Sequence, residues 1–135
     1  MTDFIFQLES TYTKLPQVLF SKLSPSPVRQ PGVVLFNEKL ANEIGLNLSD
    51  MSKEVRADLF AGNFVPEGTE PFAQAYAGHQ FGNFTMLGDG RAIVLGEHLT
   101  PSGQRLDLQL KGSGRTPYSR GGDGRAALGP MLREY

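Results

Sequence analysis

A lysine, an arginine and closely spaced glycines suggest that this chain binds a phosphate-bearing ligand. Lys111 ends the run Arg105 to Lys111, in which leucines alternate with polar residues. Such alternation predicts a strand that presents its leucines on one face and Lys111 on the other. Arg91 follows the turn Gly88-Asp89-Gly90, and a guanidinium can form paired hydrogen bonds with a phosphate. Because glycines let backbone amides approach a phosphate closely, this combination predicts a phosphate site.

Positive charge is concentrated in the last part of the chain. The 135 residues include 13 Lys or Arg and 14 Asp or Glu, which gives a formal net charge of −1. From Arg105 onward, however, basic residues outnumber acidic ones, and a glycine-rich loop follows Lys111. A cationic segment in a nearly neutral protein indicates a local anion site. The loop has few apolar side chains, and we expect it to need a ligand or partner to become ordered.

Length and composition place the chain among ordinary globular proteins. A chain of 135 residues is long enough for one domain. No apolar run approaches the roughly 20 residues that cross a bilayer, so we expect no membrane association. The start Met1-Thr2-Asp3 has an acid where a signal or transit peptide has basic residues, and we expect a cytoplasmic protein. The absence of cysteine excludes disulfides and cysteine-bound metal.

The elements that position the site divide into a supporting part, 1–69, and a nucleotide-binding part, 70–135. The supporting part is expected to contain an arm and helices that pack on the second part. Its expected elements are an extended arm at 24–27, a strand at 33–36, a helix capped by Asn37 and ended near Gly45, and a helix at 50–61 with Val55, Leu59 and Phe60 buried and Gly62 as its stop.

The nucleotide-binding part is expected to be an antiparallel sheet with flanking helices, which makes the fold class α+β. Its expected elements are a helix at 71–76 broken by Gly78, a tight hairpin of strands 84–87 and 91–97 around Gly88-Asp89-Gly90, a turn at 100–103, a strand at 105–111 that pairs with the preceding strand, and a helix with Pro130 in its first turn. That last helix is very short, and we expect the chain to be a piece of a longer protein.

Strand, glycine turn, strand, lysine strand and glutamate helix is the order of elements in a protein-kinase N-terminal lobe. Longer strings carry a more specific resemblance. The strings AYAGHQFGNF (75–84), LGDGRAIVLGE (87–97), LQLKGSGRTPYSRGGDGRAALGPMLREY (108–135) and the earlier PVRQPGVVLFNEKLANEIGL resemble the N-terminal part of the selenoprotein O family, whose bacterial members are called YdiU. The resemblance implies an atypical kinase fold that binds ATP in a reversed orientation and transfers AMP to the hydroxyl groups of proteins.

The resemblance also implies roles for individual residues. It assigns ATP-phosphate contacts to Gly88, Gly90 and Arg91, phosphate binding to Lys111 with Glu134 as its helix partner, and nucleotide contacts to Asp123 and Gly124. It implies Mg²⁺ or Mn²⁺ as the metal. The catalytic aspartate and the metal ligands fall beyond Tyr135, so no catalytic or metal-binding residue is assigned within this chain. Transfer of UMP from UTP instead of AMP from ATP stays open.

Each of these residues also has a purely structural interpretation. A Gly-Asp-Gly segment is most often only a hairpin turn, and a lysine at a strand end often only protects an edge. Asp123 could serve an Asx turn in its own loop. His79 and His98 have no partner at metal-ligand spacing, so a metal role is disfavoured for both.

Two other functions compete with the adenylyltransferase. One is a catalytically dead, kinase-like module that only binds nucleotide. The other, less favoured, is an RNA-binding element, because Arg115, Arg120 and Arg125 lie among glycines. We expect the 135 residues alone to be inactive, because the catalytic base and the metal ligands lie elsewhere. We also expect exposed apolar surface that promotes self-association.

Overall fold

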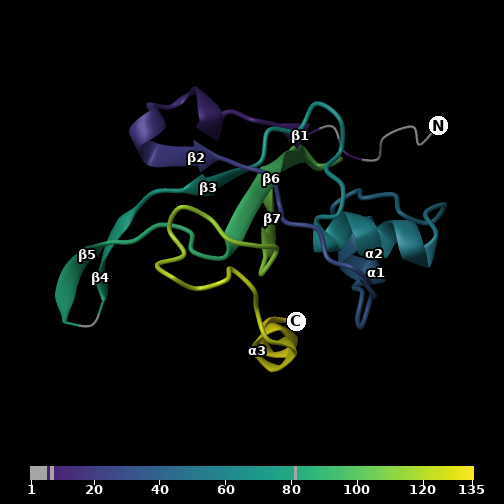
Figure 1. Ribbon diagram of the computed structural model, residues 1–135. Helices are drawn as coiled ribbons and strands as arrows, with labels where there is room; N and C mark the ends of the chain where they lie inside the picture. The colour runs from purple at the N-terminus through teal and green to yellow at the C-terminus, as the bar shows by residue number, and fades with distance from the viewer. Residues whose placement is uncertain (1–5, 7, 81) are drawn as a thin grey trace.

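The computed structural model describes residues 6, 8–80 and 82–135, and these form an α+β structure of two antiparallel sheets and short helices (Figure 1). The elements are, in order, β1 (Leu8–Glu9), the 3-10 helices η1 (Tyr12–Lys14) and η2 (Gln17–Leu19), β2 (Phe20–Lys22), α1 (Glu38–Glu43), α2 (Lys53–Ala61), β3 (Phe72–Gln74), β4 (Ala77–Gln80), β5 (Asn83–Met86), β6 (Ala92–Leu99), β7 (Arg105–Lys111) and α3 (Leu128–Glu134). No helix among the described residues is long and apolar enough to cross a membrane.

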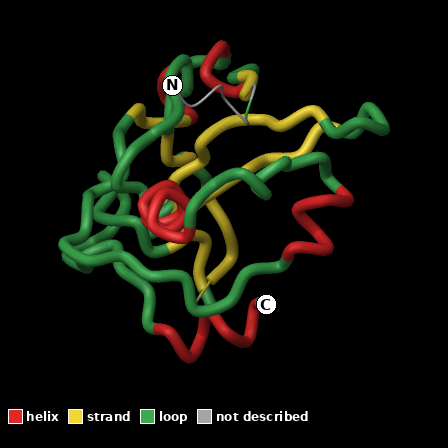
Figure 2. The backbone as a smooth tube through the Cα atoms, turned by 90° about the vertical axis from the view of Figure 1, so that its right-hand side faces the viewer, coloured by secondary structure: helices red, strands yellow, loops and turns green. Residues whose placement is uncertain are grey.

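The larger sheet is organised around β6. One edge of β6 pairs with β7, and its other partners are β1, at Glu97 and His98, and β3, at Val94. Strand β2 extends the sheet by pairing with β3. The sheet therefore joins strands from the first 22 residues to the strand that ends at Lys111. Figure 2 shows the strands running through the middle of the molecule with the helical turns around them.

Two apolar clusters hold the sheet in place. One contains Phe20, Phe72 and Val94, with Tyr12 stacked on Phe72 at 5.1 Å between ring centroids. The other joins the N-terminal segment to the helices α1 and α2; its buried members are Phe6, Ala41, Leu46, Leu48 and Leu59. Aromatic and aliphatic side chains buried in this way supply most of the stabilisation of such a small sheet.

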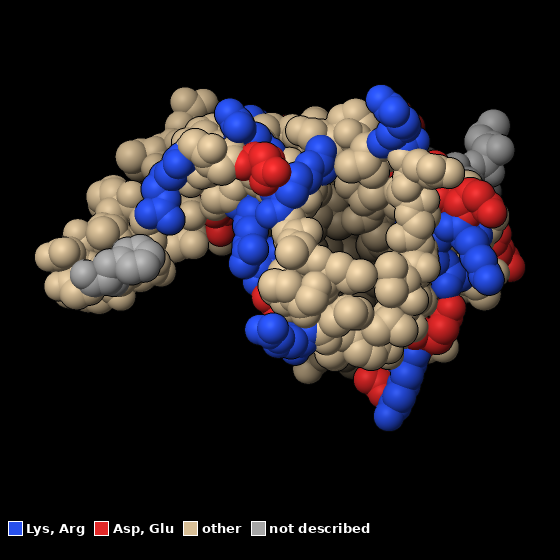
Figure 3. All heavy atoms as spheres, turned by 60° about the horizontal axis from the view of Figure 1, so that its bottom comes forward, with Lys and Arg blue, Asp and Glu red and all other residues tan. Residues whose placement is uncertain are grey.

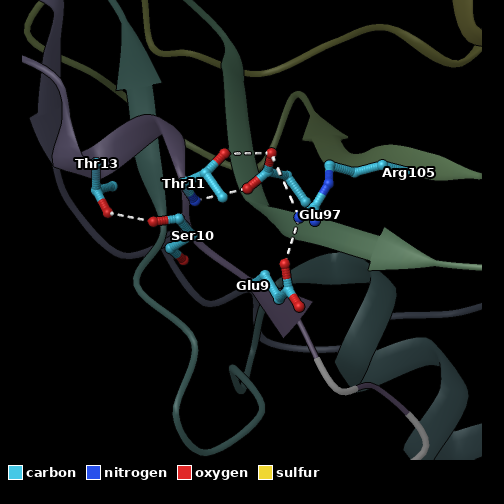
Figure 4. A network of polar contacts seen from close by, with 6 residues as sticks. All are labelled: Glu9, Ser10, Thr11, Thr13, Glu97 and Arg105. Carbon is cyan, nitrogen blue, oxygen red and sulfur yellow. Dashed lines mark hydrogen bonds and ion pairs between the residues drawn. The ribbon is translucent and has the colours of Figure 1, made fainter.

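A polar network fastens the N-terminal segment to the sheet (Figure 4). The backbone N–H and the hydroxyl of Thr11 each donate to the Glu97 carboxylate at 2.6 Å. Arg105 of β7 bonds to Glu9 of β1, and its guanidinium lies 4.0 Å from Glu97. Burial works to raise the pKa of Glu97, but the Thr11 hydrogen bonds and the charges of Arg105 and Lys14 outweigh it and lower that pKa below its ordinary 4.5.

The predicted strand at 105–111 and its pairing are confirmed. Strand β7 spans Arg105–Lys111 and runs antiparallel to β6, with Lys111 opposite Ala92. Leu106, Leu108 and Leu110 are the more buried residues of the strand, as the alternation predicted. The predicted turn at 100–103 is also present, because the Gly103 N–H donates to the Thr100 carbonyl at 2.9 Å.

The predicted helix at 71–76 is wrong. Residues Phe72–Gln74 form β3, and Gly78, predicted to break that helix, lies inside β4. The side chains of Phe72 and Ala73 are 2% and 0% exposed, and β3 pairs with strands on both sides. Burial of Phe72 among Tyr12 and Phe20 therefore decides the conformation, overriding the local signal of Pro71 in a first helical turn.

The predicted tight hairpin around Gly88-Asp89-Gly90 is also wrong. Strand β5 pairs with β4, not with β6, and the two form a separate hairpin that projects from the molecule (Figure 1). The 88–90 segment instead connects this small sheet to the large one. Two hydrogen bonds between Asp89 and Gln74 hold it against β3: the Asp89 N–H donates to the Gln74 carbonyl at 2.8 Å, and the Gln74 N–H donates to the Asp89 carboxylate at 2.9 Å.

The two predicted helices of the first part are present, but the predicted strand at 33–36 is not. Asn37 caps α1 by accepting the Leu40 N–H at 2.9 Å, and Gly62 ends α2 in the left-handed conformation with φ 82°. Residues 33–36 form no strand. Phe60, predicted to be buried, is 38% exposed, and Ala57 takes the buried position on α2 instead.

The predicted extended arm at 24–27 lacks helix or strand and is clamped to the rest of the molecule. Asn63 binds the backbone of Val28 in both directions, at 2.7 and 3.0 Å. The Ser26 N–H donates to the Ser113 carbonyl at 2.8 Å, and the Arg125 guanidinium donates to the Ser26 carbonyl through two nitrogens at 3.2 Å. The arm therefore braces the glycine-rich loop that follows β7.

Candidate nucleotide-binding site

All six residues predicted to contact nucleotide line one open cavity of about 530 Å³. The 88–91 turn supplies Gly88, Gly90 and Arg91, and the end of β7 supplies Lys111. The loop after β7 supplies Asp123 and Gly124. A volume of this size lies within the range of small-molecule sites. On this face of the molecule, Lys and Arg side chains gather between the projecting hairpin and an uncharged hollow (Figure 3).

Register between β6 and β7 brings Arg91 and Lys111 to the same end of the sheet. Lys111 lies opposite Ala92, the first residue of β6, and the Gly112 N–H donates to the Arg91 carbonyl at 2.7 Å. The two cations, 20 residues apart in the chain, therefore border the same cavity.

Glu134 of α3 holds the Lys111 ammonium. The Lys111 Nζ donates to the Glu134 Oε1 at 2.6 Å, and the two side chains are 34% and 52% exposed. Helix α3 begins at Leu128, so Pro130 lies in its first turn as predicted. A contact between such exposed groups adds little stability. Its physical effect is to fix where the ammonium lies at the border of the cavity.

The glycines of the 88–91 turn pack closely against the loop after β7, and Gly88 also packs against Gln74 of β3. A Cβ on Gly88, whose φ is +102°, would lie 2.6 Å from Tyr118 Cγ and 2.9 Å from the Gln74 carbonyl oxygen. A Cβ on Gly90 would lie 3.0 Å from the Tyr118 carbonyl oxygen. Close approach of the two segments is therefore an additional reason for these glycines, beside the predicted approach of a phosphate.

Polar contacts within the chain order the glycine-rich loop, contrary to the expectation that a ligand or partner must do so. The Thr116 hydroxyl donates to the Asp89 carbonyl, and the Ser119 hydroxyl donates to the Gly90 carbonyl at 2.5 Å. The Thr116 N–H in turn donates to the Ser119 hydroxyl at 2.8 Å. These hydroxyls replace the missing apolar contacts and join the two walls of the cavity.

Asp123 and Gly124 shape the end of this loop. The Asp123 carboxylate accepts the Arg125 N–H at 2.9 Å, which is the Asx turn considered from the sequence. Gly124 has φ +71°, and a Cβ there would lie 1.9 Å from the Gly114 carbonyl oxygen. Only glycine fits this crossing of the chain.

The lining carries more positive than negative charge. The basic residues in it are Arg91, Lys111, Arg120 and Arg125, and the acidic ones are Asp89 and Asp123. The Asp89 carboxylate is turned toward β3, where it accepts the Gln74 N–H at 2.9 Å. Burial raises the pKa of Asp89, and the Gln74 hydrogen bond only partly offsets this. Because the four cations outnumber the two carboxylates, the lining favours an anion.

The described residues offer no cluster of three or more His, Cys, Asp and Glu side chains that could hold a metal ion. The implied Mg²⁺ or Mn²⁺ has no built site among them, and no chemical step is assigned to a metal here. His98 is buried, and its Nε2 lies 2.6 Å from the Ile44 carbonyl oxygen, so it joins β6 to the end of α1. His79 packs edge-on against Phe84 in the projecting hairpin.

Sequence reasoning did not place several residues of the cavity. Tyr76, just before β4, and Gln80, the last residue of β4, line the cavity, and so do Gln109 and Tyr118. Gln109 precedes Lys111 by two residues, so the strand period signals that both share a face. The β4–β5 hairpin was not predicted, so nothing placed Tyr76 or Gln80 at the cavity.

Comparison with known proteins assigns the family. A family model described as "Protein adenylyltransferase SelO" matches residues 4–135. The chain belongs to the SelO family. It is 64% identical over 130 residues to a protein of Anoxybacillus flavithermus named "Protein nucleotidyltransferase YdiU", with 96% of this chain and 27% of that protein covered. Proteins of the same name from Brevibacillus brevis and Nitrosococcus oceani are 62% and 60% identical, over 26% and 27% of their lengths.

The chain thus spans about a quarter of the length of the curated relatives that it matches. The resemblance drawn from the sequence strings is confirmed by this family match. The full-length relatives are named as nucleotidyltransferases, an enzyme class that acts on nucleotides. The contacts of individual residues with nucleotide stay predictions.

Proposed function

We propose that this chain is the N-terminal nucleotide-binding part of a protein adenylyltransferase with a kinase-like fold. In this proposal, residues 70–135 carry the nucleotide site and residues 1–69 support it. The full-length protein transfers AMP from ATP to Ser, Thr or Tyr hydroxyls of other proteins. The observation that carries the proposal is the convergence of Arg91, Lys111 and the two glycine-rich segments on one cation-rich cavity.

The chemistry explains why such groups are needed. Adenylyl transfer is an attack on the α-phosphorus with pyrophosphate as the leaving group, so negative charge grows on phosphate oxygens. Arg91 offers a planar, two-pronged donor, and Lys111 offers a point charge fixed by Glu134. We assign both to the phosphates of ATP, with Gly88, Gly90, Asp123 and Gly124 shaping the backbone around them.

Nucleotide binding and transfer are tested separately in the full-length protein. Calorimetric titration with ATP and Mg²⁺ should show binding that Lys111→Ala weakens by about tenfold or more, as expected for the loss of a charged hydrogen bond. Lys39→Ala is the control, because Lys39 is 88% exposed on α1 and lies outside the cavity. Equal affinities of the wild type and Lys111→Ala would contradict the assignment.

Transfer is followed with ATP labelled at the α-phosphate. Label on protein hydroxyls supports adenylyl transfer, and parallel incubation with labelled UTP decides between AMP and UMP. ATP binding without any transfer would indicate the catalytically dead module instead. Of the three arginines that suggested RNA binding, Arg125 is turned onto the Ser26 carbonyl and is not free to bind RNA.

A further inference from the structure

Arg120 has a backbone conformation that an arginine adopts only at a cost. Its φ is 49°, in the left-handed region, and it is the one non-glycine residue with positive φ among the described residues. The next residue, Gly121, also has positive φ, at 85°. Glycine would adopt the conformation of residue 120 without steric cost, so the backbone gives no reason for an arginine there.

The fold gives no reason for the Arg120 side chain either. It is exposed, and within the described part of the chain its guanidinium makes no hydrogen bond or ion pair. Some arginines of the chain have structural partners: Arg125 binds the Ser26 carbonyl, and Arg56 lies 2.6 Å from Glu38. Arg120 instead combines a place in the cavity lining with the lack of a partner among the described residues, as Arg91 does. An unneutralised guanidinium on a strained backbone position is typical of a ligand-binding residue.

Arg120 lines the same cavity as Arg91 and Lys111 and follows Ser119, whose hydroxyl donates to the Gly90 carbonyl. Arg91 and Lys111 belong to the end of the β6–β7 sheet, whereas Arg120 belongs to the loop after β7. Neither of the acidic residues described in the lining forms an ion pair with Arg120: the Asp89 carboxylate accepts the Gln74 N–H, and the Asp123 carboxylate accepts the Arg125 N–H. The cavity therefore has cations from two segments, the end of the β6–β7 sheet and the loop after β7, and an anion in it could bind both.

We propose that Arg120 is a further phosphate-binding residue of this site, holding the nucleotide phosphates against Arg91 and Lys111. This inference rests on the proposed function, since it deepens the description of the same cavity. The bound group is a nucleoside triphosphate, and the guanidinium forms charge-assisted hydrogen bonds with its phosphate oxygens. The loop carrying Arg120 thus contributes charge as well as shape.

Variants at position 120 separate charge from backbone strain. Arg120→Gln removes the charge and keeps a long side chain on the same backbone. Arg120→Gly removes the charge and suits a φ of 49°. Arg120→Lys keeps the charge. The matched control is Arg115→Gln, because Arg115 is exposed in the same loop but does not line the cavity.

The assay is calorimetric titration of the full-length protein with ATP and Mg²⁺ at two salt concentrations. Arg120→Gln and Arg120→Gly are each expected to raise the Kd for ATP about tenfold, the factor for one lost charged hydrogen bond. Arg120→Lys should bind ATP almost as tightly as the wild type, and Arg115→Gln should bind it with the same affinity as the wild type. The melting temperature of Arg120→Gly should be no lower than that of the wild type, because the strain is relieved. The loss of affinity should also shrink at high salt.

Two different failures can be told apart. If the wild type binds ATP and both charge-removing variants bind it equally well, the role of Arg120 is refuted while the nucleotide site stands. If the wild type binds no ATP, the proposed function and this inference both fail. A loss in Arg115→Gln equal to that in Arg120→Gln would also overturn the proposal, since it would indicate a general effect of loop charge.

Discussion

Replacement of Gly88 by alanine tests whether the two glycine-rich segments are packed as tightly as the structure shows. A Cβ at this position would meet Tyr118 Cγ at 2.6 Å and the Gln74 carbonyl oxygen at 2.9 Å, with φ at +102°. The positive φ alone costs an alanine about 1–2 kcal/mol. Overpacking against a ring and a backbone carbonyl adds about 1–3 kcal/mol. The free energy of unfolding should therefore fall by about 2–5 kcal/mol in Gly88→Ala.

Gly121→Ala is the matched control, because Gly121 has a similar φ of +85° but no atom within 4 Å of its Cβ position. It should lose only the conformational part, about 1–2 kcal/mol. Urea unfolding of both variants and the wild type, followed by circular dichroism, measures the difference. Equal losses in the two variants would refute the close contact between Gly88 and Tyr118. A larger loss in Gly121→Ala would refute it as well.

Three further predictions concern the ion pair, the polar network and the apolar surface. Because the side chains of Lys111 and Glu134 are 34% and 52% exposed, Glu134→Gln should lower the free energy of unfolding by less than about 1 kcal/mol. It should nevertheless weaken ATP binding severalfold, since the Lys111 ammonium loses the group that positions it. Unchanged ATP affinity would show that Glu134 does not position Lys111. Because the folded state lowers the pKa of Glu97, its ionised carboxylate stabilises the fold above pH 4.5, and this stabilisation is lost as pH falls through the folded pKa. Thr11→Val removes the hydroxyl that donates to Glu97, so it should be less stable than the wild type at pH 7 and approach wild-type stability in acid. A difference in unfolding free energy that does not change with pH, measured by urea unfolding, would contradict this. Residues 1–135 should self-associate through the groove of about 580 Å³ between the 28–37 segment, α2 and α3. In sedimentation, Val34→Asp, in the groove, should therefore be monomeric. The control Val18→Asp lies at an exposed position outside the groove and should associate as the wild type does. A monomeric wild type would exclude the association.

Local patterns predicted the elements that depend on neighbouring residues in the chain. The leucine alternation of 105–111 fixes which residues of a strand share a face, and β7 follows it. Asn37 and Gly62 act through hydrogen bonds and dihedral angles within a few residues, and both helix ends are found where expected. Such signals need no knowledge of the rest of the fold.

The errors lie where distant partners decide the structure. Phe72 becomes part of a strand because Tyr12 and Phe20, more than 50 residues earlier, bury it. Strand β5 pairs with β4, and the segment 88–90 is held against β3 of the large sheet by the hydrogen bond from Asp89 to Gln74. Six residues of the cavity lining were predicted, but the hydroxyl bonds of Thr116 and Ser119 that join the loop after β7 to the 88–91 turn were not. Periodicity contains no information about such nonlocal pairs.

The arm at 24–27 links the first part of the chain to the proposed anion site. The Ser26 carbonyl accepts hydrogen bonds from the guanidinium of Arg125, which lies 99 positions later in the chain. A Cβ on Gly114 would lie 2.6 Å from the Ser26 hydroxyl oxygen, so the arm also packs closely against the loop. A shortened protein that starts after this arm would keep every predicted phosphate ligand and still lose the support behind the loop that carries Arg120. The proposed triphosphate site therefore depends on residues that do not line its cavity.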